Sequence, residues 1–334
     1  MPDTVLVITG PDNDTGERVV LELQELGASF VRFDLADFPT SVGLDATLDE
    51  FGTWQGLITV RGRRINLHDI HSVFWWHPNL PSGKDMGAAS EGENLWLARE
   101  SAAALNVLCA LDCKQVNHPR DTRSSQVKAD VLMQAVRAGL TVPPTWIGTQ
   151  PTAARIFGDC APAGIVTKTL TTPQILLGGD RVRMLYTAPV DPQALDRTTV
   201  LGPCQLQHRI DTEYAVRAHV VGPEVIAVRI DAHSPAAHQD WRADYDALSY
   251  SPTTLPEDVT DGLLALTEHY GLVYAAIDLL VDSEGTVWFV DLNPAGQYGW
   301  IEQALPELDI TRKLARFLTG RIQRPPAPLL TYAS

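Results

Sequence analysis

Two carboxylates and one amide occupy matching places in two short apolar segments within residues 276–294. Asp278 lies in the first segment, and Asp291 and Asn293 lie in the second. A hairpin whose turn is centred on Glu284-Gly285 sets Asp278 opposite Asp291, with their β-carbons about 4.5–5.5 Å apart. Asn293, two residues further on, shares their face because side chains alternate along a strand.

Two ionised carboxylates at this distance, among apolar neighbours, repel each other and are costly to desolvate. A divalent cation removes the repulsion, and Mg²⁺ takes oxygen ligands together with the phosphates of a substrate. We therefore predict a magnesium site at Asp278, Asp291 and Asn293. The alternative is a sheet edge on which both carboxylates face solvent, and a slip of one residue in the pairing would place them on opposite faces.

Arginines alternate with apolar residues in a second predicted hairpin at 214–231, which has its turn at Gly222-Pro223. We expect Arg217 and Arg229 to point away from the core on the same face of this hairpin. Their planar donors suit phosphate or carboxylate oxygens, and Arg242 is a third candidate for the same task. The alternative is a set of solvated surface arginines, the commonest environment for this residue type.

One lysine stands out because it lies in an apolar strand pattern. The chain has 21 Arg but only five Lys, and Lys168 falls within the predicted strand 164–170. It either extends to the edge of the sheet or neutralises the charge of a ligand. The polar loop 171–180, with Gly178-Gly179, makes a phosphate clamp plausible, although the chain has neither a Walker-type nor a Gly-x-Gly-x-x-Gly motif. Lys128 alone has the pattern of an ordinary surface lysine.

The elements that must position these residues begin with a β-α-β unit. An apolar strand at 4–9 precedes a helix that ends near Gly27, and a strand resumes at 31–33, which predicts a parallel sheet with a right-handed crossover. Asn117-His118-Pro119 interrupts the next helix and predicts a domain boundary. Other predicted elements are strands at 57–60, 72–76 and 181–188, helices at 92–111, 124–138, 258–270 and 309–319 (the last capped by Asp309), and the two hairpins.

Composition excludes several classes of protein. The 334 residues include 26 Lys and Arg against 41 Asp and Glu, for a formal net charge of −15, which argues against nucleic acid as an obligatory partner. No apolar run approaches the ~18 residues of a membrane span, and the first residues lack the pattern of a secretory signal. We expect a cytoplasmic protein of about two domains, with its four cysteines present as buried free thiols.

Taken in order, these residues resemble the motifs of the ATP-grasp superfamily. Lys128, with the connector 138–145, matches the first nucleotide lysine, and Lys168 matches the second. The run Gln207, His208, Arg209 and Ile210 matches the adenine hinge, and Arg217 matches the arginine strand. The magnesium ligands correspond to Asp278, Asp291 and Asn293. The resemblance implies that ATP contacts the two lysines and the hinge. It also implies that Arg217 and Arg229, with Arg242, neutralise charge on the transferring phosphoryl group.

The implied fold is an α/β protein of the ATP-grasp type with three lobes, the first of which is a pre-ATP-grasp domain. They are an N-terminal parallel-sheet domain at 1–118, a central lobe at 119–203 and a C-terminal lobe at 204–320, followed by a Pro-rich tail at 321–334. The nucleotide lies between the last two lobes. This division sharpens the estimate of about two domains that length alone supplies.

Within the superfamily, the sequence resembles most closely the ribosomal-peptide maturases of the microviridin or graspetide type, over about residues 4–320. Asp34-Leu35-Ala36-Asp37-Phe38-Pro39, Trp54-Gln55-Gly56 and the run 293–300 contribute to this likeness. Such enzymes join Asp or Glu side chains of a precursor peptide to Ser or Thr hydroxyls or Lys amines. One departure is Trp75-Trp76-His77-Pro78, where relatives tend to have an aromatic residue followed by Arg-Arg-Pro. Another is His208, where many relatives have Glu.

The resemblance implies a magnesium- and ATP-dependent ligase that acts through an acylphosphate on a precursor peptide with leader and core, and a homodimeric assembly. No Ser-His-Asp or Cys-His signature indicates a protein nucleophile. Two alternatives remain. One is another ATP-grasp carboxylate–amine ligase, which acts on amino acids or on a peptide or protein terminus and shares the same nucleotide motifs. The other is a non-catalytic, nucleotide-dependent binding protein, for which decay of the magnesium ligands would be expected.

Overall fold

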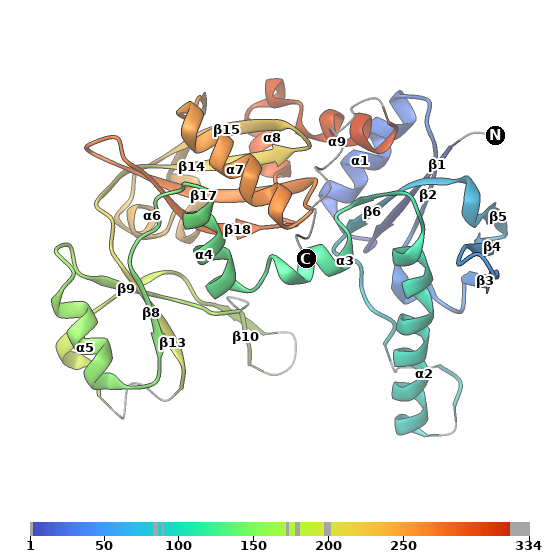
Figure 1. Ribbon diagram of the computed structural model, residues 1–334, viewed down its shortest axis with the longest axis horizontal. Helices are drawn as coiled ribbons and strands as arrows, with labels where there is room; N and C mark the ends of the chain where they lie inside the picture. The colour runs from blue at the N-terminus through green and yellow to red at the C-terminus, as the bar shows by residue number, and fades with distance from the viewer. Residues whose placement is uncertain are drawn as a thin grey trace, which may run out of the picture.

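The structure is a computed structural model that describes residues 3–82, 86–88, 90–171, 174–177, 181–196 and 202–320. The predicted Pro-rich tail at 321–334 and the pair Gly178-Gly179 lie outside the described residues. Figure 1 shows one sheet with its helices on the right of the view, a small sheet at the lower left and a larger sheet above it. No helix of the described residues combines the length and the apolar character that crossing a membrane requires.

The N-terminal part contains a parallel sheet with the strand order β2-β1-β6-β7. Its strands are β1 (Thr4–Thr9), β2 (Ser29–Phe33), β6 (Ile70–Trp76) and β7 (Lys114–Val116). Helix α1 (Asp14–Glu25) makes the crossover from β1 to β2, and the side chain of Asn13 caps it by accepting from the amide of Gly16 at 2.9 Å. The predicted β-α-β unit is confirmed.

Two further features of the N-terminal part were not predicted from the sequence. An antiparallel meander of β3 (Val42–Leu48), β4 (Trp54–Val60) and β5 (Arg63–Asn66) covers one face of the parallel sheet, whereas the sequence predicted only one of these strands. Helix α2 (Glu91–Ala104) ends earlier than predicted, and a 3-10 segment at 105–110 follows it.

The central part is a small antiparallel sheet with the order β12-β9-β13-β8, packed on helix α5 (Pro151–Asp159). Its strands are β8 (Thr145–Gly148), β9 (Ile165–Lys168), β12 (Ala188–Val190) and β13 (Cys204–His208). Because β13 pairs with both β8 and β9, this sheet extends beyond residue 203, where the sequence placed the end of the central lobe. The three lobe limits themselves stay predictions.

A short strand lies within the polar loop that the sequence predicted at 171–180. Strand β10 (Gln174–Leu176) pairs antiparallel with β11 (Val182–Met184). The expectation of an irregular loop is therefore wrong at residues 174–176. Strand β10 has only three residues, which is too short for an alternation of apolar and polar residues to be recognised, whereas β11 lies within the strand predicted at 181–188.

The C-terminal part is a five-stranded antiparallel sheet with the order β16-β15-β14-β17-β18. Its strands are β14 (Thr212–Val221), β15 (Glu224–Ala232), β16 (Leu248–Thr253), β17 (Tyr274–Asp282) and β18 (Val287–Asn293). Both predicted hairpins are present. Helices α4 (Lys128–Arg137) and α7 (Glu257–His269) pack an apolar stripe against one face of this sheet.

The opposite face of this sheet joins the N-terminal part through one continuous core. Helix α9 (Ile310–Leu318) packs between them with α1 and α8 (Gly299–Ala304), and the buried rings of Trp76, Tyr274 and Tyr298 lie in the same cluster. This core fixes the N-terminal sheet against the sheet that holds the predicted magnesium ligands.

Two predicted helix limits need correction. The helix predicted at 124–138 begins only at Lys128, as α4, because a separate helix α3 (Pro119–Ser124) precedes it and the exposed Val127 lies between the two. Asp309 precedes α9 in a left-handed conformation (φ 57°), and its side chain makes no cap hydrogen bond. The short helix α6 (Pro235–Gln239) lies between β15 and β16.

Candidate active site

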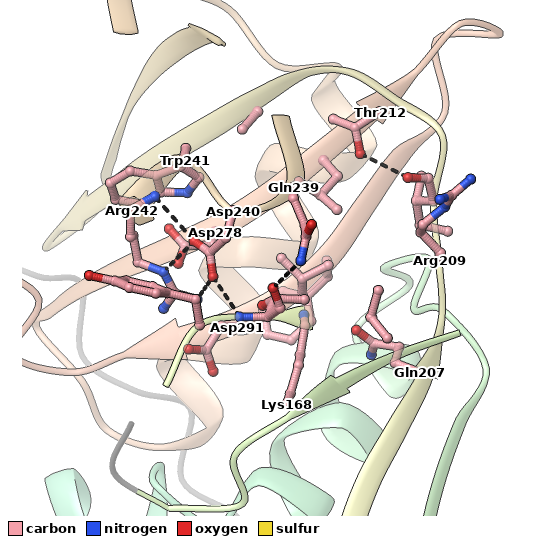
Figure 2. A pocket seen from close by; sticks show the side chains of 18 of the residues that line it. Lys168, Gln207, Arg209, Thr212, Gln239, Asp240, Trp241, Arg242, Asp278 and Asp291 are labelled. Atoms are coloured by element: carbon pink, nitrogen blue, oxygen red, sulfur yellow. Dashed lines mark hydrogen bonds and ion pairs between the residues drawn. The ribbon is translucent and has the colours of Figure 1, made fainter. Parts of the chain in front are cut away.

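A cavity of about 1140 Å³ opens between the central and C-terminal sheets. The predicted residues that line it are Lys128, Lys168, Gln207, His208, Arg209, Ile210, Arg242, Asp278, Asp291 and Asn293. Figure 2 shows Gln207 and Arg209 on one side of this cavity and Arg242, Asp278 and Asp291 on the other. The structure thus brings the predicted lysines, hinge and acidic set to one site, whereas Arg217 and Arg229 are absent from the described lining.

Asp278 lies opposite Asp291, as predicted, but the register of the hairpin changes between its turn and this pair. Near the turn, Val281 pairs with Val287 and Leu279 pairs with Phe289, which is one residue away from the predicted register. An irregularity follows at this point, where the strand that carries Asp291 contains one extra residue, and the predicted register is restored. Asn293, paired with Ala276, shares the face of the two carboxylates.

The prediction that Arg217 and Arg229 share a face is wrong. The two-residue turn at Gly222-Pro223 pairs Val221 with Glu224, so that Arg217 lies opposite Val228 and Arg229 lies opposite Val216. Residues that lie opposite each other on paired strands share a face of the sheet. In this register an odd-numbered residue of one strand always lies opposite an even-numbered residue of the other. The two odd-numbered arginines therefore point to opposite faces of the sheet.

Arg217 points into the protein rather than away from its core. Its side chain is buried beside Asp278, to which it is also paired along the ladder, and its Nη1 donates to Asp278 Oδ1 at 2.6 Å. Burial lowers the pKa of Arg217, but the Asp278 carboxylate more than offsets this and holds that pKa above its ordinary value. Arg217 thus keeps its positive charge beside Asp278, one of the predicted magnesium ligands.

The argument that the two carboxylates are unpaired must also be corrected. Besides the Arg217 pair, Lys128 Nζ lies 3.5 Å from Asp291 Oδ1, so each carboxylate has a cation beside it. Repulsion alone therefore does not require a metal. Two carboxylates and an amide oxygen on one face of a cavity still fit Mg²⁺, which commonly takes one or two carboxylates and completes its shell with phosphates and water. Among the described residues, no group of three or more His, Cys, Asp or Glu offers another metal site.

Lys168 lies on the opposite wall of the cavity, on strand β9, where it pairs with Gln205 of β13. Burial lowers its pKa to about 8, and the charges of Arg242 and Lys128 act in the same direction, while Asp291 opposes them. The lowered pKa of Lys168 indicates a positive charge without full compensation. An anionic ligand in the cavity would supply that compensation.

Arg242 is held in place by a neighbour that the sequence analysis missed. Its Nε and Nη2 donate to the two oxygens of Asp240, each at 2.8 Å. Burial lowers the pKa of Arg242, but the Asp240 carboxylate more than offsets this, so that the pKa lies above its ordinary value. Asp240 also accepts from the amide of Thr187 at 2.9 Å, which connects the two walls of the cavity. The sequence signal for the orienting role of Asp240 was only its position two residues before Arg242.

The predicted hinge is fixed by backbone contacts with the strands beside it. The amide of His208 donates to Pro144 O at 3.0 Å, and the amide of Arg209 donates to Gly164 O at 2.9 Å. The His208 ring packs on Phe157, with 4.8 Å between the ring centroids. The Arg209 side chain points away from the acidic pair in Figure 2 and lies 3.3 Å from Asp211.

Gln205 is a further lining residue that the sequence analysis missed. Its side chain is buried, and its Oε1 has no hydrogen-bond partner. Buried polar atoms are nearly always paired, so this oxygen indicates space for a polar ligand or for water.

Arg229 and His77 complete the account of the predicted positions. Arg229 donates to both oxygens of Asp231 and lies over the Tyr214 ring at 3.8 Å, so the structure does not bring it to the described cavity. His77, at the departure noted in the sequence, does line the cavity, and its Nε2 donates to Ala295 O at 2.7 Å.

Several known proteins resemble this chain in sequence or in fold. A family profile described as the MvdD pre-ATP grasp domain matches residues 4–121. The chain is similar to a Chryseobacterium gregarium RiPP-associated ATP-grasp ligase in complex with ADP and a leader and core peptide, with 25% identity and a TM-score of 0.85, over 96% of this chain and 98% of that one. No curated protein matches the chain.

Two other solved structures share the fold. The macrocyclase MdnC from Microcystis aeruginosa MRC, bound with precursor peptide MdnA, has 24% identity and a TM-score of 0.79, over 95% of this chain and 99% of that one. The ATP-grasp ligase PsnB, complexed with a minimal precursor, Mg and ADP, has 20% identity and a TM-score of 0.71, over 96% and 97% of the two chains. The chain thus has the ATP-grasp fold, and the resemblance inferred from its motifs is confirmed.

Proposed function

We propose that the chain is an ATP-dependent ligase that forms ester or amide crosslinks between side chains of a ribosomally made precursor peptide. One observation supports this most strongly. The cavity that collects the predicted lysines, hinge and acidic set occurs in a chain that is similar, over 96% of its length, to a RiPP-associated ATP-grasp ligase in complex with ADP and a peptide.

The proposed reaction has two steps. An Asp or Glu carboxylate of the peptide attacks the γ-phosphorus of ATP, the bond to the β-γ bridging oxygen breaks, and an acylphosphate and ADP result. A Ser or Thr hydroxyl, or a Lys amine, then attacks the acyl carbon. Phosphate leaves with the bonding electrons, and the proton of the nucleophile passes to phosphate or solvent. The peptide loses one water for each crosslink, and no protein nucleophile is required.

Each wall of the cavity has its own task in this reaction. We propose that residues 207–210 meet the adenine and that Lys128 and Lys168 hold the phosphates. Arg242, oriented by Asp240, faces the transferring phosphoryl group, whereas the buried Arg217 acts through Asp278. Asp278, Asp291 and Asn293 would hold Mg²⁺, which when bound neutralises phosphate charge.

The remaining parts of the proposal concern partner, assembly and location. We propose a precursor peptide with leader and core as the partner, ATP and Mg²⁺ as cofactors, a homodimer as the assembly and the cytoplasm as the location. The peptide and the nucleotide are supported by the complex of the Chryseobacterium ligase with ADP, leader and core. The homodimer and the cytoplasm rest on the motif resemblance and on composition.

The test is mass spectrometry of candidate precursor peptides that are incubated with the protein, ATP and Mg²⁺. We expect successive losses of water that depend on ATP, with ADP released in step with each loss. The Asp291→Ala variant should leave the peptide mass unchanged. ADP release that no peptide stimulates, or peptides that gain phosphate and never lose water, would contradict the proposal.

A further inference from the structure

The segment that follows Asn293 is held by side chains from other parts of the chain. Asn117 Nδ2 donates to Pro294 O at 2.7 Å, and His77 Nε2 donates to Ala295 O at 2.7 Å. The Tyr274 hydroxyl donates to Gly296 O at 2.6 Å. Three consecutive carbonyls thus each accept a hydrogen bond from a different side chain, two of which belong to the N-terminal part of the chain.

Asn117 makes the most of these contacts. Its side chain is 4% exposed, and its Nδ2 also donates to Tyr274 O at 2.6 Å. Its Oδ1 accepts from the amides of Val273 and Tyr274, at 2.8 and 3.0 Å. Two donors and two acceptor sites are all that a side-chain amide offers, so its hydrogen-bonding capacity is complete. Asn117 therefore connects the start of β17 to the residue directly after Asn293.

Asn293 needs such support more than the two carboxylates do. Asp278 and Asp291 face each other inside the β17–β18 ladder, whereas Asn293 is the last residue of β18 and is exposed. Its Oδ1 accepts from the amide of Ala295 at 3.0 Å, so its side-chain position depends on where Ala295 lies. A carbonyl-type oxygen has two acceptor sites, which leaves one for a ligand. The contacts of Asn117 and His77 fix Pro294 and Ala295, the two residues that directly follow Asn293.

We infer that Asn117, with His77 as a second contact, is a positioning residue for Asn293 and thereby couples the N-terminal domain to the metal end of the cavity. This inference rests on the proposed assignment of Asn293 as a magnesium ligand. Residues that orient metal ligands typically change metal affinity by about 10–100-fold when they are replaced. A residue that merely stabilises the junction between the domains would lower the melting temperature without this specific effect.

The test measures ADP affinity by titration calorimetry, with Mg²⁺ and with a chelator, and it requires no peptide. The wild-type protein should bind ADP more tightly with Mg²⁺, and Asn293→Ala should remove part of that gain. We expect Asn117→Asp to weaken the apparent Mg²⁺ affinity by about 10–100-fold, with little change in ADP affinity in the chelator. Asn66→Ala is the matched control because Asn66 is an exposed asparagine of the same domain that donates only to Asp69.

A double variant separates positioning from general stability. If Asn117 acts through Asn293, combining Asn117→Asp with Asn293→Ala should weaken the Mg²⁺ affinity little more than Asn293→Ala alone, whereas independent effects would add. Should Asn117→Asp not fold, His77→Gly decides the question, since His77 is exposed and its positive φ of 45° suits glycine. It should lower the Mg²⁺ affinity in the same direction by a smaller factor.

Three outcomes would overturn the inference. They are an unchanged Mg²⁺ dependence in well-folded variants at both positions, additive effects in the double variant, and a wild-type protein whose ADP affinity does not respond to Mg²⁺. The last would also remove the magnesium assignment. Failure of the peptide reaction would be seen separately, as a wild-type protein that binds Mg²⁺ and ADP but leaves every candidate precursor unchanged.

Discussion

The two sheets that form the cavity differ in how firmly they are built. The C-terminal sheet has strands of six to ten residues, and both its faces are covered by large cores that include α7, α9 and part of the N-terminal domain. The central sheet has strands of three to five residues, over a cluster of only four buried hydrophobic residues. Regions with fewer buried contacts open at a lower free-energy cost. We therefore expect the central sheet to move against a fixed C-terminal sheet when a ligand enters.

The two sheets also differ in how their charged side chains are paired. On the C-terminal sheet, Asp278 and Asp291 already have Arg217 and Lys128 beside them. On the central sheet, Lys168 has a pKa lowered by burial, and no ion pair with Lys168 is found among the described residues. The rigid C-terminal wall thus has both of its carboxylates paired with cations, whereas Lys168 on the lighter central wall is not paired with an anion among the described residues. A ligand that contacts both walls would therefore add to the hydrogen bond from Thr187 to Asp240, which already joins them.

The largest effect should come from the rigid wall. Asp291→Ala removes a proposed magnesium ligand and leaves Lys128 without its carboxylate, so ATP turnover should fall by at least about 100-fold. The fold should survive because the Asp291 side chain is one-third exposed. Phosphate release with peptide and ATP measures the turnover, and the melting curve measures the fold. Normal phosphate release by a folded Asp291→Ala protein would remove the metal assignment.

The lighter wall should respond differently when its lysine is replaced. Lys168→Met should weaken ATP binding by at least about tenfold, the loss of one charge-assisted contact, yet raise the melting temperature of the free protein at pH 7. The rise is expected because the folded protein carries a desolvated charge below pH 8 that methionine does not. Calorimetry and thermal melts check both effects. A Lys168→Met protein that is less stable at pH 7 would contradict the assignment of burial as the cause.

The pH dependence of the same lysine sharpens the contrast. The folded pKa of about 8 lies below the ordinary 10.5, so between these values the unfolded chain holds a proton that the folded chain lacks. The unfavourable contribution of Lys168 to stability is therefore full below pH 8 and disappears as the pH rises to 10.5. Affinity for ATP should conversely fall as the pH rises above 8. Lys168→Arg, which stays charged, should show a flat affinity over that range.

How far the sequence could predict this site depends on the range of the interactions. Asp278 and Asp291 were predicted to face each other because both lie in one hairpin, where the turn and the alternation are local signals. Arg217 and Arg229 were misplaced because the parity of a two-residue turn was not applied to their pairing. The burial of Arg217 could not be predicted, since its neighbours Asp278 and Trp241 belong to segments that come later in the chain.

A smaller loss should follow when the orientation of Arg242 is disturbed. Asp240→Asn keeps the shape of the side chain but removes the charge from a pair with two 2.8 Å contacts. We expect turnover to fall about tenfold, equivalent to about 1.4 kcal/mol in the transition state, with ATP affinity nearly unchanged. Asp244→Asn is the matched control, because Asp244 accepts from Ser234 and is not among the described cavity residues. Equal losses in both variants would show that Asp240 acts only on stability.

The smallest effect is expected at Arg229, whose side chain turns to the face away from the cavity. Its pair with Asp231 is about one-third exposed at both ends, and such pairs contribute about 0.2–1 kcal/mol. Arg229→Ala should therefore lower stability by less than about 1 kcal/mol and leave turnover unchanged, whereas Arg217→Ala on the adjacent strand should abolish turnover by leaving Asp278 without its cation. Denaturant unfolding and phosphate release distinguish the two. Similar losses of turnover at both positions would mean that the hairpin presents both arginines to the ligand, and that the register described for this sheet is wrong.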